Sequence, residues 1–312
     1  MFVHNVTLST PVNKKSLILL ARLINSIVAL VVKNRFIYLP ENSIVKFRRL
    51  KKALFLSAFF IASDSALASI VQTNPPDNCP AFVSSEKAQI RYIHDGDTVH
   101  LSDNRKVRLI GIDTPELARK VRHQWLPEQA FAKEARDYAR DLIDQLGNQV
   151  NLMPGIEPTD KYGRKLFHIQ LSDDSLLQSR LLKAGLAIAF TTPPNQQFSQ
   201  CYQQLENQAK AQQRNIWTHS KYRSITASSL TPVNKGFHII KGKISHIGES
   251  KKAFWINFQS NFSARIKKTD IKYFSYALDV LVNKTITIKG WVRHYNGKAQ
   301  ISLRHPSAIE QL

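Results

Sequence analysis

Hydrophobic and polar residues alternate over short runs between residues 88 and 171, a pattern typical of β-strands. Turn-forming residues separate these runs, and Asp95-Gly96-Asp97 is the clearest of the turns. The predicted strands cover residues 88–102, divided by that turn, and residues 105–112, 149–153 and 165–171.

A period near 3.6 residues predicts three helices between and after these strands. The first opens at Pro127, repeats its apolar positions from Phe131 to Leu142, and stops at Gly147. The other two cover residues 175–184 and 198–217, and the hydrophobic stripe of the last is assigned to the core.

A second group of strands follows a Ser/Thr-rich stretch, residues 220–234, which is predicted to be a linker. The pattern predicts three strands, a helix over residues 269–282, and two more strands that meet at the hairpin signal Asn296-Gly297. The five strands cover residues 237–247, 253–259, 262–267, 284–295 and 298–304. This order is that of an OB-fold, so a smaller OB-like barrel is expected over residues 235–312.

The first 68 residues have the pattern of a helical targeting region. Residues 46–68 combine a basic start, an apolar run of about ten residues and an Ala-Leu-Ala exit, as a secretory signal peptide does. Such a run is too short to span a membrane as a helix, which needs about 20 residues. Export to the periplasm or the cell exterior is therefore predicted, with residues 69–86 as the N-terminal arm.

The position of this signal leaves two interpretations open. A signal peptide begins at the start of a chain, so translation is expected to begin near Val45, which would make residues 1–44 an extension outside the protein. The alternative is an inner-membrane anchor in the apolar stretch at residues 17–32, which Arg22 and Asn25 interrupt.

Charge and cysteine content narrow the class of protein. The 312 residues include 44 Lys and Arg against 23 Asp and Glu, for a net charge of +21, and this excess favours a polyanionic partner. Residues 224–312 alone hold 14 basic and 4 acidic residues. The two cysteines exclude a disulfide-dense scaffold and a cysteine-based zinc site.

Three polar clusters at the ends of predicted strands are candidates for chemistry, at residues 94–98, 108–116 and 160–164. Asp97 and Asp113 offer the oxygen ligands that Ca²⁺ prefers. Arg108 and Arg164 can each grip phosphate oxygens with a planar fork and stabilise a pentacovalent transition state. The three clusters together suit a site that binds a hard cation and a phosphate.

Glu116 and Gly111 complete this candidate site. Glu116, which follows Pro115, is placed to orient or deprotonate an attacking water. Arg108 and Asp113 are five residues apart, so a regular strand would point them to opposite faces. Gly111 offers a bend or bulge that would let the two side chains converge.

The motifs DGDT (95–98), RLIGIDTPE (108–116) and DKYGR (160–164) resemble those of the staphylococcal nuclease, or thermonuclease, family. The segments LLKAGLA (181–187) and RNIW (214–217) extend this resemblance, which covers residues 87–219. It implies a mainly β, α+β fold with an OB-type five-stranded barrel and three helices. It also implies Ca²⁺-dependent hydrolysis of DNA and RNA at the 5′ P–O bond, leaving 3′-phosphates.

The resemblance also implies roles for individual residues. Asp97, Asp113 and the carbonyl of Thr114 would hold calcium, with Asp95 behind them, and Arg108, Arg164 and Glu116 would be catalytic. Lys161 and Tyr162 would contact a substrate phosphate. Phe190 is also expected near the substrate, at the position where the family has a tyrosine. The segment 117–126 departs from the family pattern.

A noncatalytic nucleic-acid-binding protein with two barrels is the alternative from another class. That interpretation expects some of the acids or arginines of the candidate site to be replaced by other residues, and all of them are present here. A membrane-tethered nuclease is the third interpretation, if residues 17–32 are kept.

The fourth strand of the C-terminal domain carries cations and aromatics on one face: Lys289, Trp291, Arg293 and Tyr295. Such a face suits single-stranded DNA or RNA, because bases stack on aromatics while phosphates meet cations. The alternative is that Trp291 and Tyr295 pack under the first domain. The domain resembles OB-type modules appended to bacterial secreted nucleases, and no obligate protein partner is inferred.

Cys79 lies in the N-terminal arm and Cys201 in the last helix of the first domain. In an oxidising compartment these residues are expected to form a disulfide that pins the arm across that helix. Two free thiols are the alternative.

Overall fold

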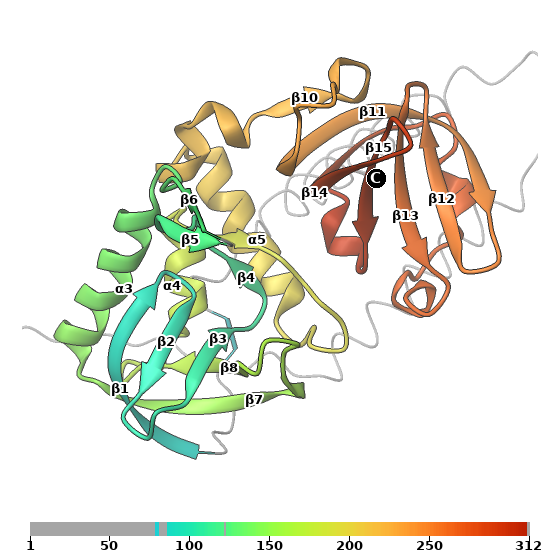
Figure 1. Cartoon of the computed structure of the whole chain (residues 1–312). Coiled ribbons are helices and arrows are strands. Elements are labelled where there is room, and N and C mark those ends of the chain that lie inside the picture. Colours follow the sequence, from blue (N-terminus) through green and yellow to red (C-terminus); the bar gives the residue numbers. More distant parts are fainter. Residues whose placement is uncertain (1–78, 81–85, 122, 311–312) are drawn as a thin grey trace, which may run out of the picture. The chain divides into compact units, whose positions relative to one another are not determined.

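The computed structural model describes residues 79–80, 86–121 and 123–310, coloured along the chain in Figure 1. The predicted signal peptide at 46–68, the alternative anchor at 17–32 and most of the arm at 69–86 lie outside these residues. None of the described helices is both long enough and apolar enough to cross a membrane.

Five strands close the first barrel, in the order β1-β2-β3-β8-β7. All neighbouring pairs are antiparallel except β3 and β8, which run parallel. The strands are β1 (Glu86–Asp95), β2 (Thr98–Leu101), β3 (Lys106–Leu109), β7 (Gln149–Thr159) and β8 (Lys165–Gln170). The predicted five-stranded barrel is confirmed, and the turn between β1 and β2 falls at Gly96, as expected.

Three α-helices accompany this barrel in the described part of the chain: α3 (Ala132–Leu146), α4 (Leu177–Lys183) and α5 (Ser199–Ala211). The predicted third helix is too long, because the chain leaves α5 after Ala211 and forms a 3-10 turn over Asn215–Thr218. Gln213 and Asn215 have positive φ angles of 49° and 41°, which a continuous helix does not allow. The helices bury aliphatic residues against the barrel, and Leu177, Leu181 and Leu205 are fully buried.

Two short ladders lie beside the barrel. In the first, β4 (Ile112–Asp113) pairs with β9 (Ile188–Ala189), and this pairing fixes the strand that carries Asp113. In the second, β5 (Arg119–Val121) pairs with β6 (Gln124–Leu126) in an exposed hairpin. This hairpin occupies the segment that departs from the family pattern.

A second circuit of five strands forms the C-terminal domain: β11 (Gly236–Glu249), β12 (Ala253–Phe258), β13 (Phe262–Lys267), β14 (Thr285–Tyr295) and β15 (Lys298–Leu303). Their order is β11-β12-β13-β15-β14, and β11 also pairs with β14, so that the sheet closes on itself. The parallel pair is again the third strand with the fifth, β13 with β15. The two circuits therefore share one topology.

The helix predicted over residues 269–282 is wrong. Two 3-10 turns, Ile271–Tyr273 and Leu278–Leu281, stand in its place. This segment contains Ile, Tyr, Phe and Val residues, which are poor helix formers, and the turns direct Phe274, Leu278 and Leu281 into the barrel core.

The predicted linker at residues 220–234 is also structured. It contains 3-10 turns at Ser220–Tyr222 and Ala227–Ser229, and between them β10 (Ser224–Thr226), which pairs in parallel with β11. The segment is therefore an edge of the C-terminal sheet.

A third hydrophobic cluster joins the two domains. Trp217 and Tyr222 come from the end of the first domain and pack with Phe237 and Ile239 of β11. The predicted disulfide is present, with 5.6 Å between the Cα atoms of Cys79 and Cys201, so the arm is fixed to α5.

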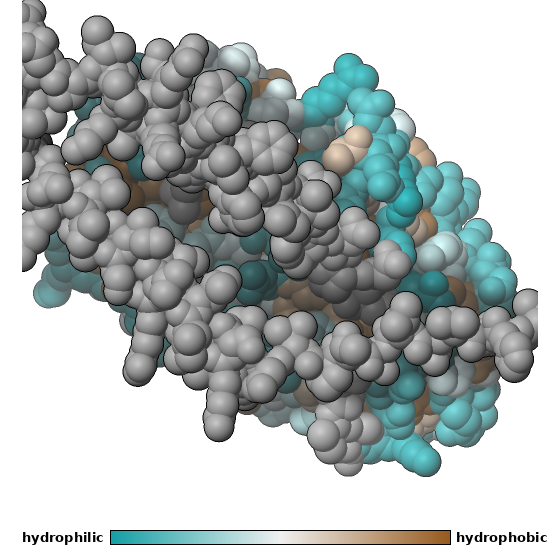
Figure 2. Space-filling view, turned by 180° about the vertical axis from the view of Figure 1, so that it is seen from behind, coloured by the Kyte–Doolittle hydropathy of each residue, from teal (hydrophilic) through white to brown (hydrophobic). Residues whose placement is uncertain are grey.

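Figure 2 shows the molecule from behind. Where described atoms are uncovered in this view, hydrophilic side chains predominate at the surface and hydrophobic ones lie mostly between or beneath them.

Candidate active site

The turn between β1 and β2 brings the first two acids to the site. The backbone N–H of Asp97 donates to Oδ1 of Asp95 at 3.1 Å, which holds the turn in shape. Gly96 is necessary here, because a Cβ atom at this position would lie 2.8 Å from Cγ2 of Thr114. The absence of a side chain at Gly96 therefore lets this turn pack directly against the Asp113–Thr114 segment.

A bend at Gly111 brings Arg108 of β3 and Asp113 of β4 together, as predicted. Gly111 has a φ of +83°, and a Cβ atom there would lie 2.6 Å from the ring of Tyr202. The carbonyl of Gly111 accepts a hydrogen bond from the N–H of Phe190 at 2.9 Å. Both the backbone angle and the close ring require glycine at the bend.

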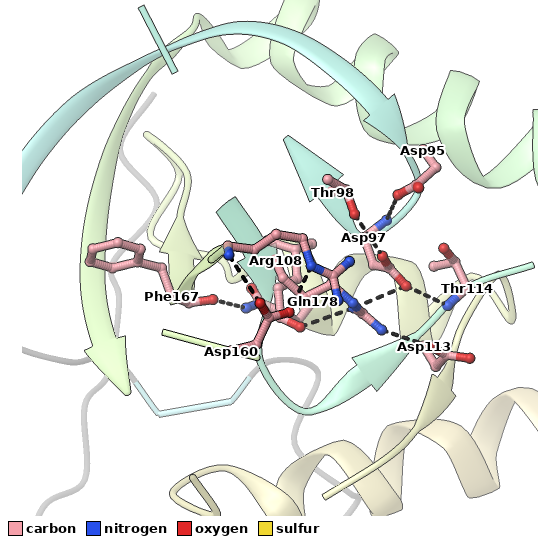
Figure 3. Close-up of polar contacts among 11 residues, drawn as sticks. Asp95, Asp97, Thr98, Arg108, Asp113, Thr114, Asp160, Phe167 and Gln178 are labelled. Carbon is pink, nitrogen blue, oxygen red and sulfur yellow. Dashed lines mark hydrogen bonds and ion pairs between the residues drawn. The ribbon is translucent and has the colours of Figure 1, made fainter. Parts of the chain in front are cut away.

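The guanidinium of Arg108 bridges two carboxylates, Asp97 from the turn before β2 and Asp113 from β4 (Figure 3). Its Nη1 lies 2.9 Å from Oδ2 of Asp97, and its Nη2 lies 2.6 Å from Oδ1 of Asp113. Asp97 also accepts from the N–H of Thr114 at 2.8 Å and from the hydroxyl of Thr98 at 3.1 Å. The five residues form one connected polar cluster.

Burial and the crowding of carboxylates shift the titration of this cluster. Burial raises the pKa of Asp97 above its usual range. Burial, together with the charges of Asp97 and Glu116, raises the pKa of Asp113 to about 7, although Arg108 opposes this. Burial disfavours the charged form of Arg108, but the carboxylates of Asp97 and Asp113 outweigh it and raise its pKa. The cluster therefore favours additional positive charge near the two aspartates.

Glu116 lies close enough to this cluster to affect the pKa of both Arg108 and Asp113. Its side chain is 40% exposed and lies 3.7 Å from Nε of Arg119, the first residue of the exposed hairpin. The N–H of Gln129 donates to the carbonyl of Glu116 at 2.9 Å. Glu116 thus combines a fixed backbone with a carboxylate that solvent can reach.

The loop between β7 and β8 carries the second arginine. Asp160 accepts from Nε of Arg164 at 2.7 Å and from the N–H groups of Tyr162 and Arg164 at 2.9 and 3.0 Å. These bonds hold the pKa of Asp160 below its usual value despite partial burial. Lys165, the next residue, pairs with Val107 of β3, so Arg164 lies beside the strand that carries Arg108.

Lys161 and Tyr162 lie at the exposed tip of this loop. The ring of Tyr162 is 72% exposed, and Nζ of Lys161 lies 4.9 Å from its centroid. Both side chains are therefore accessible from solvent. Within the described part of the chain, neither they nor Arg164 form a hydrogen bond or ion pair with Asp97 or Asp113.

The donors near Arg108 fit a hard cation. The carboxylates of Asp97 and Asp113 and the carbonyl of Thr114 are all oxygen donors, the type that Ca²⁺ selects. The side chain of Asp113 is 27% exposed, so one carboxylate faces solvent. Among the described residues no three His, Cys, Asp or Glu side chains form a ready metal cage.

The C-terminal residues predicted to bind substrate divide into two groups. Lys289 is 2% exposed and forms an ion pair with buried Glu206 of α5, so its predicted role as a phosphate contact is wrong. Trp291 packs edge-on against Phe190, with 4.5 Å between ring centroids, as the alternative of packing under the first domain expects. Arg293 and Tyr295, further along β14, are exposed.

Phe190, which was also expected near the substrate, is half-buried and makes a packing contact at the domain junction. The ring lies against Trp291, and its backbone anchors the bend at Gly111. Sequence patterns miss this role because Trp291 is about 100 residues away in the chain.

Lys221 and Tyr222 lie close enough to Asp113 for its charge to act on them, which the sequence pattern did not indicate. Lys221 donates to Oε1 of Gln129 at 2.9 Å, and the charge of Asp113 affects the pKa of both Lys221 and Tyr222. Burial lowers the pKa of Lys221 and raises that of Tyr222 to about 12. No motif marks these two residues, and both fall in residues 220–234, which were predicted to be a linker.

The site consists of a closed barrel with two aspartates bridged by an arginine, a second arginine in the loop before the adjacent strand, and an accessible glutamate. This combination is typical of a phosphodiester-cleaving enzyme. Residues 106–219 match the family described as "Staphylococcal nuclease homologue".

Similar proteins point to the same family. The chain is 35% identical to a thermonuclease of Staphylococcus intermedius over 138 residues, which are 43% of this chain and 78% of that protein. It is 33% identical to a thermonuclease of Staphylococcus hyicus over 129 residues, 40% of this chain and 72% of that protein. Endonuclease YhcR of Bacillus subtilis is 29% identical over 40% of this chain and 11% of its own length.

The chain belongs to the staphylococcal nuclease family. It is a nuclease, a hydrolase that acts on phosphodiester bonds.

Proposed function

We propose that this nuclease is exported, depends on Ca²⁺, and cuts both DNA and RNA at the 5′ P–O bond. In this reaction water attacks the phosphorus atom and the bond to the 5′ oxygen breaks. One product then ends in a 3′-phosphate and the other in a 5′-hydroxyl. The cluster of Asp97, Arg108 and Asp113 is the observation that carries the proposal.

Asp97, Asp113 and the Thr114 carbonyl would hold the calcium ion. When bound, calcium would neutralise negative charge on the scissile phosphate. The guanidinium forks of Arg108 and Arg164 would bind the equatorial phosphate oxygens, where charge increases in the transition state. Glu116, whose carboxylate reaches solvent, would accept a proton from the attacking water or orient it.

The cutting reaction can be tested on single-stranded DNA and RNA with calcium and then with EGTA. We expect cutting only with calcium. Arg108→Ala should reduce kcat at least about 100-fold, because a preorganised donor to the transition state is lost. Glu116→Gln should also reduce kcat, with little change in the affinity for substrate.

Arg140→Ala is the matched control, because this arginine lies on α3 with a half-exposed side chain and belongs to none of the three motifs. It should cut at the wild-type rate. Cutting that continues in EGTA would exclude the calcium requirement, and full activity of Arg108→Ala would exclude the assigned site.

Export is supported by the signal-like pattern at residues 46–68 and by the disulfide between Cys79 and Cys201, since such bonds persist in oxidising compartments. N-terminal sequencing of the native protein tests it. We expect the mature chain to begin at Ser69, whereas a chain that retains residues 17–32 would be membrane-tethered.

A further inference from the structure

We infer that the C-terminal barrel has a binding face for single-stranded nucleic acid on the outer surface of β12, β13, β15 and the end of β14. Only the choice of ligand rests on the proposed function; the face is separate from the cutting site. We call it the outer face, and it consists of Trp255, Arg265, Lys267, Arg293, Tyr295 and Lys298.

Strand register puts these side chains on one surface. The residues that point inward along β12 and β13, such as Ile256, Ala264 and Ile266, are buried in the barrel core. Their neighbours in the chain point outward, because successive residues of a strand alternate between faces. Trp255 is opposite Arg265, and Tyr295 is opposite Lys298.

The rows of paired residues continue across four strands. Arg265 is paired with Ser302 of β15, and Ser263 with Gln300, which in turn is paired with Arg293 of β14. The surface from Trp255 to Tyr295 therefore spans three strand spacings, about 14 Å. This is wide enough for several nucleotides, since OB-folds bind about 4 to 16.

Aromatic rings and cations are interleaved on this surface. The guanidinium carbon of Arg265 lies 5.9 Å from the centroid of the Trp255 ring. The indole N–H of Trp255 donates to Oγ of Ser250 at 3.2 Å, which fixes the ring. Tyr295 is 68% exposed at the other end. Rings that are held in place but remain accessible can stack on bases at a low entropic cost.

The electrostatics of the outer face suit a polyanion. Strands β12, β13, β14 and β15 contain no Asp or Glu. Within the described part of the chain, Arg265, Lys267, Arg293 and Lys298 form no ion pair with a carboxylate. Glu249, the last residue of β11, forms an ion pair with Lys268. Phosphates can therefore meet cations that have no internal partner.

Side chains near the start of β14 are covered at the domain junction, whereas those at its end are exposed on the outer face. Lys289 and Trp291 point outward on the same strand, but the first domain covers them. Arg293 and Tyr295 follow them and are free. This explains why only part of the surface predicted from the fourth strand is available, and why β12 and β13 supply the rest.

The test uses the full chain in EGTA, so that the strand is bound but not cut. Binding of a fluorescein-labelled 12-mer of thymidylate is measured by fluorescence anisotropy at several salt concentrations. We expect Arg265→Glu with Arg293→Glu to weaken binding at least tenfold. The slope of log K against log salt should fall by about 1.4, because each phosphate contact to a single strand contributes about 0.7.

Lys241→Glu with Lys284→Glu is the matched control. Both lysines are exposed on the same barrel but lie outside the outer face, and the change in net charge is the same. This variant should bind within about threefold of wild type. If it weakens binding as much as the outer-face variant does, the positive charge acts without a specific site and the inference is overturned.

Tyr295→Ala tests stacking on a side chain that is not needed for folding. Loss of one stacked base should weaken binding by about fivefold or more and leave the salt slope unchanged. Unchanged affinity in both Tyr295→Ala and the Arg265, Arg293 double variant would overturn the inference. The inference would also be overturned if the wild-type protein did not bind the 12-mer but bound phosphatidylglycerol vesicles, and if the double variant weakened that vesicle binding.

Cutting of a dinucleotide with calcium separates this inference from the proposed function. A dinucleotide is too short to occupy both sites, so we expect the outer-face variants to cut it at the wild-type rate. Failure of wild type to cut the dinucleotide would count against the proposed function, whereas the binding result in EGTA bears on the outer face alone.

Discussion

Arg108 serves the site through the shape of its side chain as well as through its charge. Its two terminal nitrogens lie 2.9 Å from Asp97 and 2.6 Å from Asp113, and the side chain is only 14% exposed. A lysine has a single terminal nitrogen, so it cannot reproduce this planar bridge. We therefore expect Arg108→Lys to preserve the charge balance of the buried cluster better than Arg108→Ala, yet to lose most of the activity.

His168 illustrates a titratable residue whose role is structural. It is 3% exposed in the first barrel, and its Nδ1 lies 2.8 Å from the hydroxyl of Tyr202, the residue that packs under Gly111. Burial lowers the pKa of His168 to about 3. The ring is therefore neutral under ordinary conditions, and its Nδ1 shares a hydrogen bond with the hydroxyl of Tyr202.

His168 should make the fold sensitive to acid. Its folded pKa lies below its unfolded value of about 6.5, so its contribution to stability is complete above pH 6.5 and is lost as the pH falls toward 3. The slope is about 1.4 kcal/mol per pH unit. Between pH 7 and 4.5, the free energy of unfolding of wild type should therefore fall by about 2 to 3 kcal/mol more than that of His168→Asn.

Asparagine is the suitable replacement because its side-chain amide can accept or donate the hydrogen bond to Tyr202 without titrating. Guanidinium unfolding of both proteins at the two pH values, in EGTA, measures the difference. Equal losses of unfolding free energy in the two proteins would show that His168 does not remain neutral in the fold.

At the scale of elements, the sequence predicted what depends on local pattern. The strand that ends at Asp95, the bend at Gly111 and the hairpin at Asn296-Gly297 all have local signals, and the structure contains each of them. The convergence of Arg108 and Asp113 could also be predicted, because their odd spacing required a bend between them. Local alternation and glycine positions are therefore sufficient for most of the first barrel.

Elements that depend on tertiary packing could not be predicted in this way. Residues 269–282 have helix-like hydrophobic spacing, but the barrel core takes up Phe274 and Leu281 through two 3-10 turns. The segment 220–234 has the composition of a linker, yet β10 pairs with β11. The closeness of Lys221 to Asp113 follows from the same folding of the linker, so no local pattern could indicate it.

At the scale of the whole molecule, an ion pair connects the two domains to the site. Lys289 of β14 pairs with Glu206 of α5, and both side chains are fully buried. Glu206 also accepts from the N–H of Ala189 at 2.9 Å, and β9, which contains Ala189, pairs with the strand that contains Asp113. Through Glu206, the C-terminal barrel therefore helps to hold β9 and its partner β4, the strand that contains the candidate calcium ligand Asp113.

Breaking this pair from one side should be costly. Lys289→Met would leave the Glu206 carboxylate buried beside a methionine, and removal of one partner from a buried pair costs about 3 to 5 kcal/mol. The double variant Lys289→Met with Glu206→Gln should recover most of that loss, because glutamine is uncharged and can still accept from Ala189. Guanidinium unfolding measures both variants, and 12-mer binding in EGTA is measured alongside. One combined result would contradict this role of the pair: an unfolding free energy of Lys289→Met within about 1 kcal/mol of wild type, together with weaker binding of the 12-mer. Lys289 would then contact substrate, and the ion pair would not stabilise the contact between the domains.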